Sequence, residues 1–233
     1  MGALVAALPV ISSLYGSAVV VVAGPAVLAP GALAEAFAED LAFLRYTGAR
    51  PVVVHDAGAE PVPRAPGEDA ATALRTVAAG LVQRRLVGLV NAHGPLAVGI
   101  TGEDGHTLTR TARGDLVADP GVLRTLLDDG RIPVVAAVAH GEDGPHAADV
   151  TTTARLLAAH LSARRLLLPP DAEAAGTAGG TTGFDTAVPH ALLRTLYEPD
   201  PPAPDGIDPS GTPGFPTAGQ AEHVLGLPGA RRP

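Results

Sequence analysis

The sequence contains no lysine, no cysteine and no tryptophan. All sixteen basic side chains are therefore arginines, and no ammonium side chain is available anywhere in the 233 residues. Without cysteine, disulfides, thiolate metal sites and cysteine nucleophiles are excluded, and we expect a cytoplasmic protein. Aromatic residues make up only 3% of the chain, so a core has to be built mainly from Ala, Val and Leu.

The charge is acidic, and long uninterrupted apolar runs are also missing. A net charge of −8 argues against a nucleic-acid surface, because binding to a phosphate backbone needs clustered cations. The first thirty residues are apolar, but Gly16, Ser17, Gly24 and Pro25 interrupt them. A bilayer span needs about 20 consecutive apolar residues. We therefore expect a buried strand here, and neither nucleic acid nor a membrane as a partner.

Short β-branched runs alternate with longer helical patterns along most of the chain. This alternation, with strands that are apolar throughout, indicates an α/β fold with a mainly parallel sheet covered on both faces. We expect a loop at Gly24-Pro25 and a continuous helix over 68–86. The strands are expected at 18–23, 51–55, 131–138 and 165–168, and the other helices at 31–47, 120–130 and 151–163.

Two segments differ from this pattern. Residues 170–186 are rich in Ala, Gly and Thr, and residues 198–233 are rich in Pro and Gly. Both are predicted to be loops, with an extended tail at the end. We expect one α/β domain over 1–197 and a tail over 198–233.

Four runs resemble acetylglutamate kinase, of the amino-acid-kinase family. They are AFAEDLAFLRYTGARPVVVH (36–55), LVGLVNAHGPLAVGITGEDG (86–105), GDLVADPGVLRTLLDDGRIPVV (114–135) and VPHALLRTL (188–196). The resemblance covers about residues 6–169 and a short piece near 188–197. It implies the family's three-layer αβα sandwich around a mainly parallel open sheet. It also implies a subunit contact near His93, and hence a homodimer or a hetero-oligomer with a related kinase.

The sequence departs from the family at the positions that handle phosphate. Where the family's first strand ends in a lysine followed by an aromatic residue and two glycines, this chain has Val22, Ala23, Gly24 and Pro25. Pro25 removes one backbone N–H. The family's second loop reads Gly-Gly-Gly-Pro, whereas this chain has Asp56, Ala57, Gly58 and Ala59. An aspartate at position 56 repels phosphoryl oxygens.

The remaining family positions are matched less directly. Its substrate arginine corresponds to Arg64, across a deletion. The catalytic aspartate corresponds to Thr151 in a gapless alignment, or to Asp149 after a slip of two residues. After Leu168 the chain runs almost directly into the family's last helix, so most of the ATP-binding half is expected to be missing. The resemblance therefore implies a reduced nucleotide-binding half without the second catalytic lysine.

A polar segment, His140 to Asp149, contains two histidines and three acids. Imidazole and carboxylate groups suit several divalent ions, and this edge of a parallel sheet is also where ligands bind. The spacing is not that of a metal site, however, and a polar loop between strand and helix explains the segment equally well. We predict no metal and no cofactor.

Three hypotheses follow from these patterns. The first is a catalytically degenerate relative without phosphoryl transfer, which binds a small acylated amino acid or a protein. The second is a repurposed ATP-independent enzyme for an amino-acid derivative in a specialised bacterial pathway. The third is a kinase in which arginine replaces lysine. However, the residue at the position of the family's first lysine is Val22, and residues 170–186 contain no arginine.

The second hypothesis names a set of candidate residues. Arg64 can clamp a carboxylate through two hydrogen bonds. A carboxylate at Asp56 can orient the His55 imidazole only if the chain turns at 56, because adjacent strand residues point to opposite faces. The candidate acid/base residues are His55, Asp56, His146 and Asp149, and the candidate substrate-binding residues are Gly24, Pro25, Gly58 and Arg64.

Overall fold

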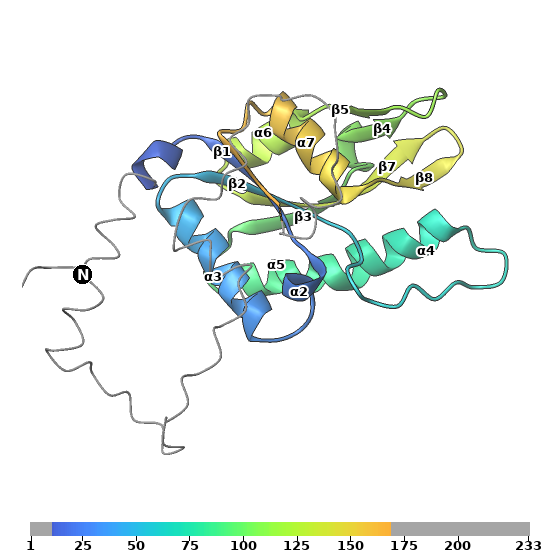
Figure 1. Cartoon of the computed structure of the whole chain (residues 1–233), viewed down its shortest axis with the longest axis horizontal. Coiled ribbons are helices and arrows are strands. Elements are labelled where there is room, and N and C mark those ends of the chain that lie inside the picture. The colour runs from blue at the N-terminus through green and yellow to red at the C-terminus, as the bar shows by residue number, and fades with distance from the viewer. Residues whose placement is uncertain (1–10, 169–233) are drawn as a thin grey trace, which may run out of the picture. The chain divides into compact units, whose positions relative to one another are not determined.

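A computed structural model describes residues 11–168 of the chain. Within them the four predicted strands and the helices predicted at 31–47, 120–130 and 151–163 are present, with boundaries that differ by one to three residues, and further strands are found between them (Figure 1). The strands are β1 (Ala18–Val22), β2 (Arg50–His55), β3 (Ala97–Thr101), β4 (Leu108–Arg110), β5 (Leu116–Ala118), β6 (Ile132–Ala136), β7 (Val138–Gly141), β8 (Gly144–Ala147) and β9 (Arg165–Leu167). The helices are α2 (Pro25–Leu28), α3 (Ala32–Tyr46), α4 (Ala70–Val77), α5 (Gln83–Asn91), α6 (Gly121–Asp128) and α7 (Val150–His160), with a π-helical turn η1 (Ala78–Val82) and a 3-10 turn η2 (Asp104–His106).

The larger sheet has five strands in the order β3-β6-β2-β1-β9, and every neighbouring pair is parallel. Val20 of β1 lies opposite Val52 of β2, and Val53 of β2 lies opposite Val134 of β6. The central strands are apolar throughout because both of their faces are covered, which is why their sequences do not alternate with polar residues.

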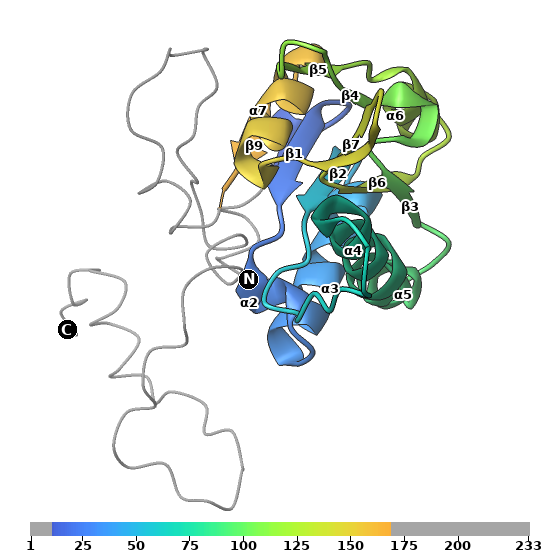
Figure 2. The ribbon, with the colours of Figure 1, turned by 90° about the vertical axis from the view of Figure 1, so that its right-hand side faces the viewer.

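Two hydrophobic clusters cover the two faces of this sheet. Val21 and Val53 pack with Phe37 and Leu41 of α3, and the same cluster includes apolar residues of α5. On the opposite face, Val54 belongs to a cluster with residues of α6 and α7. Figures 1 and 2 show these two helical layers on either side of the strands. The predicted three-layer αβα arrangement is thereby confirmed.

The sequence did not reveal a second, four-stranded sheet in the order β5-β4-β7-β8. Its two hairpins, β4–β5 and β7–β8, are antiparallel, while β4 and β7 pair in parallel. The predicted polar loop over His140 to Asp149 was therefore wrong: most of this segment forms the hairpin β7–β8. Gly144, with φ +120, closes its turn, and backbone pairing forms the strands without any run of β-branched side chains.

Two helical predictions also need correction. The helix expected over 68–86 begins at Ala70 and continues through η1 to Asn91. It extends because Leu86 and Val90, one turn apart, are both buried against the sheet. In the loop expected at Gly24-Pro25, Gly24 is extended as predicted, but Pro25 begins a short helix. Proline is favoured at the first helical position, because the N–H that it lacks would have no partner within the helix.

Within residues 11–168, none of the helices combines the length and the apolar character that crossing a bilayer requires. The loops predicted at 170–186 and 198–233 lie outside the described residues. So do the run at 188–196 and the boundary between domain and tail.

Candidate functional site

The carboxyl ends of the parallel strands meet at one edge of the larger sheet, which is where α/β folds of this type bind ligands. Backbone hydrogen bonds connect the residues that leave β1, β2 and β6 at this edge. Ala23 N–H donates to Val54 O over 2.9 Å, and Ala137 N–H donates to His55 O over 2.8 Å. Ala148 N–H in turn donates to Ala137 O over 3.0 Å. The segment that precedes α2 is therefore held beside the end of β2, and the segment that precedes α7 is held beside the end of β6, the next strand of the sheet.

The turns after β1 and β2 pack directly on each other. Gly58 has φ +61, a conformation that favours glycine, and a Cβ at this position would lie 3.1 Å from Leu28 Cδ1. Pro25 Cα would lie 3.7 Å from the same Cβ. Gly24 precedes Pro25 as the N-cap of α2. Gly24, Pro25 and Gly58 are therefore brought together, as expected for two loops that jointly border one site.

His55 lies at the end of β2 and is fully buried. Its Nδ1 lies 2.8 Å from the backbone carbonyl oxygen of Asp56. Because a carbonyl only accepts, we assign the proton to Nδ1, which leaves Nε2 as an acceptor. Within the described residues Nε2 is buried and has no hydrogen-bond partner. Burial lowers the pKa of His55, against a smaller opposing effect of its hydrogen bond to Asp56 and the charge of that residue.

The Asp56 carboxylate does not orient the imidazole. Its Oδ1 accepts a hydrogen bond of 2.7 Å from Gly58 N–H and so shapes the turn after β2. The backbone of Asp56, rather than its side chain, holds His55. The chain does turn at this point, as the expected pairing required, but the turn gives the carboxylate a different partner.

Asp149 follows Ala148 and is the N-cap of α7. Its Oδ1 accepts a hydrogen bond of 2.7 Å from Thr152 N–H, and its backbone oxygen accepts one from Thr153 N–H. Thr151 lies in the first turn of the same helix. Both residues proposed as equivalents of the family's aspartate therefore stand at the start of α7, next to the segment that leaves β6.

Arg64 and His146 are placed elsewhere. The exposed guanidinium of Arg64 donates to the backbone oxygen of Glu68, 2.9 Å from Nη2, within its own loop. No hydrogen bond in the described part of the chain joins Arg64 to the sheet edge. His146 lies on β8 in the smaller sheet. The structure thus places six of the eight candidate residues at the same edge of the larger sheet: Gly24, Pro25, His55, Asp56, Gly58 and Asp149.

Arg85, which contacts both loops at this edge, is paired with a carboxylate. Arg85 Nη2 donates to Leu28 O at 2.6 Å and to Glu60 Oε1 at 2.8 Å, which ties the end of α2 to the loop after β2. Arg85 and Glu60 are each only about one quarter exposed, at 23% and 24% of the side chain. With Asp56 and Asp149 added, the surroundings of the edge are neutral to acidic.

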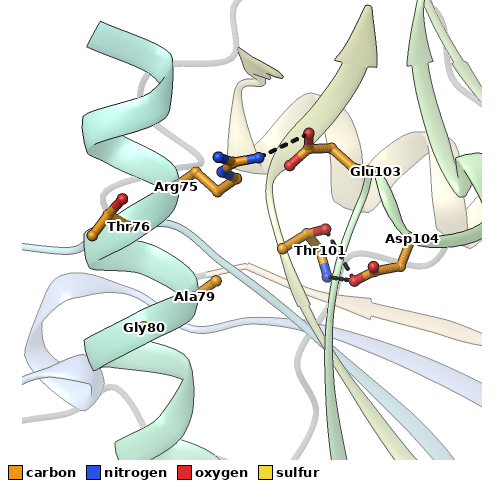
Figure 3. Close-up of a pocket in the computed structure, with 7 residues that line it drawn as sticks. All are labelled: Arg75, Thr76, Ala79, Gly80, Thr101, Glu103 and Asp104. Atoms are coloured by element: carbon orange, nitrogen blue, oxygen red, sulfur yellow. Dashed lines mark hydrogen bonds and ion pairs between the residues drawn. The ribbon is translucent and has the colours of Figure 1, made fainter. Parts of the chain in front are cut away.

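A pocket of about 460 Å³ opens beside the carboxyl end of β3 (Figure 3). Arg75 reaches from α4 toward Glu103, 3.5 Å away, while Asp104 accepts hydrogen bonds from the backbone and hydroxyl of Thr101. Sequence reasoning missed Arg75 and Thr101. One signal in the sequence could have indicated this pocket. Gly80 is an isolated glycine within a helical pattern, and such a glycine often serves packing or function. Gly80 lines the pocket and lies in the π-helical turn η1, and π-helical turns are frequent at functional sites.

No group of three or more His, Asp or Glu side chains is arranged to hold a metal ion among residues 11–168. At the sheet edge the chain offers two glycine-bearing turns, a neutral buried imidazole and carboxylates. Such a set can accept hydrogen bonds from an amide or hydroxyl. It does not supply the cations that phosphoryl transfer uses to neutralise charge.

Known proteins match most of the chain. A family model described as the Amino acid kinase family matches residues 17–173. An acetylglutamate kinase from Streptomyces coelicolor is 41% identical over 202 residues, a match that takes in 73% of this chain and 66% of that protein. An acetylglutamate kinase from Acidothermus cellulolyticus is 38% identical, over 73% of this chain and 69% of that protein. The chain therefore spans just under two thirds of the first of these relatives.

Solved structures show the same fold at low identity. An N-acetylglutamate synthase from Neisseria gonorrhoeae, complexed with coenzyme A and N-acetyl-glutamate, has a TM-score of 0.57 and 21% identity over 72% of this chain and 45% of that one. The protein smu.665 from Streptococcus mutans has a TM-score of 0.55 and 17% identity over 66% of this chain and 72% of that one.

Proposed function

The chain belongs to the amino acid kinase family and is similar to acetylglutamate kinases, and on that premise we propose that it binds a small N-acylated amino acid without transferring phosphate. The observation that carries this proposal is the composition of the sheet edge. The two glycine-bearing turns are retained and packed together, whereas lysine is absent from the whole sequence. Of the arginines nearest this edge, Arg85 is paired with Glu60.

The class of ligand follows from the hydrogen-bonding side chains at the sheet edge. The carboxylates accept hydrogen bonds, and so does the neutral His55 once the loop after β2 moves, so a ligand with an amide N–H is preferred over one with several phosphate oxygens. An N-acylated amino acid carries that amide. Asp56 and Asp149 repel both anions, but they disfavour a nucleoside triphosphate more strongly, because its negative charge is larger than that of an N-acylated amino acid.

The test measures binding and turnover on the purified full chain. Calorimetry with N-acetyl-L-glutamate is expected to show saturable binding, and an assay for ADP release with Mg-ATP is expected to show no turnover. ADP formation that depends on N-acetyl-L-glutamate would overturn the proposal. The absence of both binding and turnover would also count against it.

Two glycines in one loop provide a matched pair of variants. Gly58→Ala places a Cβ 3.1 Å from Leu28 and is expected to displace the turn and weaken binding about tenfold. Gly67→Ala introduces the same backbone strain at φ +83, but nothing lies within 4 Å of its Cβ, so binding is expected to be unchanged. Equal effects of the two variants would show that the turn after β2 does not border the ligand.

A second candidate function, an ATP-independent enzyme for an amino-acid derivative, is favoured by His55. A neutral imidazole with an unprotonated Nε2 has the protonation state that a general base needs. Because His55 is fully buried, the loop after β2 has to move before a substrate reaches it. NMR spectra of N-acyl amino acids incubated with the chain, without ATP, test this function. It requires a turnover that His55→Asn abolishes.

A further part of the proposal concerns the proteins with which this chain assembles. We propose a homodimer, or a hetero-oligomer with a related kinase, in a cytoplasmic setting. The support is the resemblance of residues 86–105 to the family's subunit-contact region. Light scattering on the chain alone, and then mixed with an acetylglutamate kinase, measures both assemblies. A monomer in both samples would contradict this part of the proposal.

A further inference from the structure

A second pocket, of about 410 Å³, lies between the two hairpins of the smaller sheet. The strands β4 and β7 are parallel neighbours, so the turns that follow them project in the same direction (Figure 1). The β4–β5 hairpin contributes Arg110 and Arg113 to the lining, while the β7–β8 hairpin contributes Glu142, Asp143 and His146. One hairpin thus supplies the cations and the other supplies the anions.

These charges are not paired with each other. Among the ion pairs of residues 11–168, none involves Arg110, Arg113, Glu142 or Asp143. The pocket beside β3 is different, because there Arg75 already meets Glu103 (Figure 3). The pocket between the hairpins therefore holds groups of both signs whose electrostatic partners are not supplied by the described part of the chain.

The His146 ring lies against the backbone of Gly141. A Cβ on Gly141 would clash with the His146 ring, so the ring can lie across β7 only because residue 141 is a glycine. His146 is half-buried and lines the same pocket, as does Thr111. A polar surface is thus held between the cationic and the anionic hairpin.

We propose that this pocket binds a small free amino acid in its zwitterionic form. The α-carboxylate binds the guanidinium groups of Arg110 and Arg113, which donate in a planar fork suited to carboxylates. The α-ammonium group binds the carboxylates of Glu142 and Asp143. A ligand with only one of the two charges satisfies one hairpin and leaves the other unpaired.

This site is separate from the sheet edge where we place the acylated amino acid, and it does not depend on that proposal. An N-acylated amino acid has lost its ammonium group and cannot pair with the β7–β8 hairpin. The two sites therefore select opposite chemical states of the amino group.

The experiment uses saturation-transfer NMR on the full chain with three probes. L-Alanine carries both charges, N-acetyl-L-alanine carries only the carboxylate, and L-alaninamide carries only the ammonium group. We expect saturable binding of L-alanine and at least tenfold weaker binding of the two blocked probes. N-acetyl-L-glutamate at a concentration equal to that of L-alanine is expected not to displace it, so failure at one site is distinguishable from failure at the other.

Variants at the exposed turns test the two hairpins separately. Arg113→Gln and Asp143→Asn are each expected to weaken L-alanine binding about tenfold, because each removes a charge-assisted hydrogen bond. Arg75→Gln, in the other pocket, is expected to leave it unchanged. Circular dichroism verifies that each variant is folded.

Two results would overturn the proposal. One is equal binding, or no saturable binding, of all three probes. The other is evidence that Arg113 and Asp143 form only an ion pair with each other. In that case Arg113→Gln and Asp143→Asn would each lower the melting temperature, the double variant would lower it no further, and L-alanine would not change the melting temperature of any of these proteins.

Discussion

At the scale of single residues, His55 combines full burial with an unused hydrogen-bonding atom. Its Nδ1–H is held by the Asp56 carbonyl, while Nε2 has no partner among the described residues. A buried acceptor without a donor carries a desolvation cost. Such a residue is typical of a position kept for a ligand, for a bound water, or for the shape of the adjoining turn.

Burial of this neutral imidazole makes stability depend on pH. The folded state lowers the pKa of His55 below its usual 6.5, so below that pH the unfolded chain binds more protons than the folded one. The free energy of unfolding therefore falls as the pH decreases from about 6.5. His55→Asn is expected to flatten this part of the profile, because asparagine does not titrate.

Urea denaturation at several pH values measures the effect. His55→Leu also removes the titration but loses the hydrogen bond to Asp56, so it is expected to be less stable than His55→Asn at every pH. A profile for His55→Asn as steep as that of the native chain would contradict the prediction.

Asp40 on α3 has the opposite dependence. Burial, and then the charge of Glu39, raise its pKa from 3.8 to about 6. The folded chain binds the extra proton, so stability falls as the pH rises from about 4 through 6. Asp40→Asn is expected to stabilise the protein at pH 7 by roughly 1 kcal/mol, since the half-buried carboxylate is partly screened by solvent. Melting curves at pH 7 and pH 4 check it: the gain should vanish at pH 4.

At the scale of elements, the π-helical turn η1 joins α4 to α5 and is followed at once by Gln83. The buried amide of this residue donates to Ile100 O at 2.7 Å and to Val134 O at 2.9 Å. It reaches these carbonyls across Gly99, whose Cβ, if present, would lie 2.7 Å from Gln83 Oε1. The helix and the edge of the sheet are thus joined by one side chain that needs a glycine opposite it.

Gly99→Ala is expected to push Gln83 away and destabilise the fold by about 1–3 kcal/mol, because the buried carbonyls lose their donors. Gln83→Ala is expected to cost a similar amount. The double variant should cost less than the sum, because the smaller residue at 83 leaves room for the new methyl group. Chemical denaturation of the four proteins gives the coupling energy.

Gly88→Ala serves as the control for that experiment. It lies in α5 with nothing within 4 Å of its Cβ, so alanine is expected to stabilise the helix by about 0.5–1 kcal/mol. Simple addition of the Gly99 and Gln83 effects would show that the two residues do not share one space.

At the scale of the whole molecule, the five-stranded sheet is the centre of the described residues. Strand β2 lies third of five strands, and both of its faces are covered by helices. The hairpins of the smaller sheet, by contrast, end in exposed turns. Stability is therefore expected to decrease from the middle of the larger sheet toward those turns.

Native-state hydrogen exchange measures this gradient. The amides of β2 and β6 are expected to exchange only by global unfolding, and those near Arg113 and Asp143 by local opening at much lower free energy. Equal protection in the two regions would show that both sheets unfold as one unit.

The sequence by itself determined the family, the α/β class and most elements of the larger sheet. Its buried strands are continuous apolar runs, and its helices repeat apolar residues every three or four positions, so both signals are local. The glycines at the site, Gly24 and Gly58, were also found from the sequence, because the resemblance aligned them with the family's two loops.

Only the tertiary structure decided which candidate residues meet and what each side chain binds. Asp56 turned to the backbone of Gly58, Asp149 capped a helix, and Arg64 and His146 lay away from the sheet edge. The β7–β8 hairpin and the pocket beside it depend on pairing between strands distant in sequence, such as β4 with β7. Local patterns do not encode those pairings, because backbone hydrogen bonds between strands are made by residues of any type.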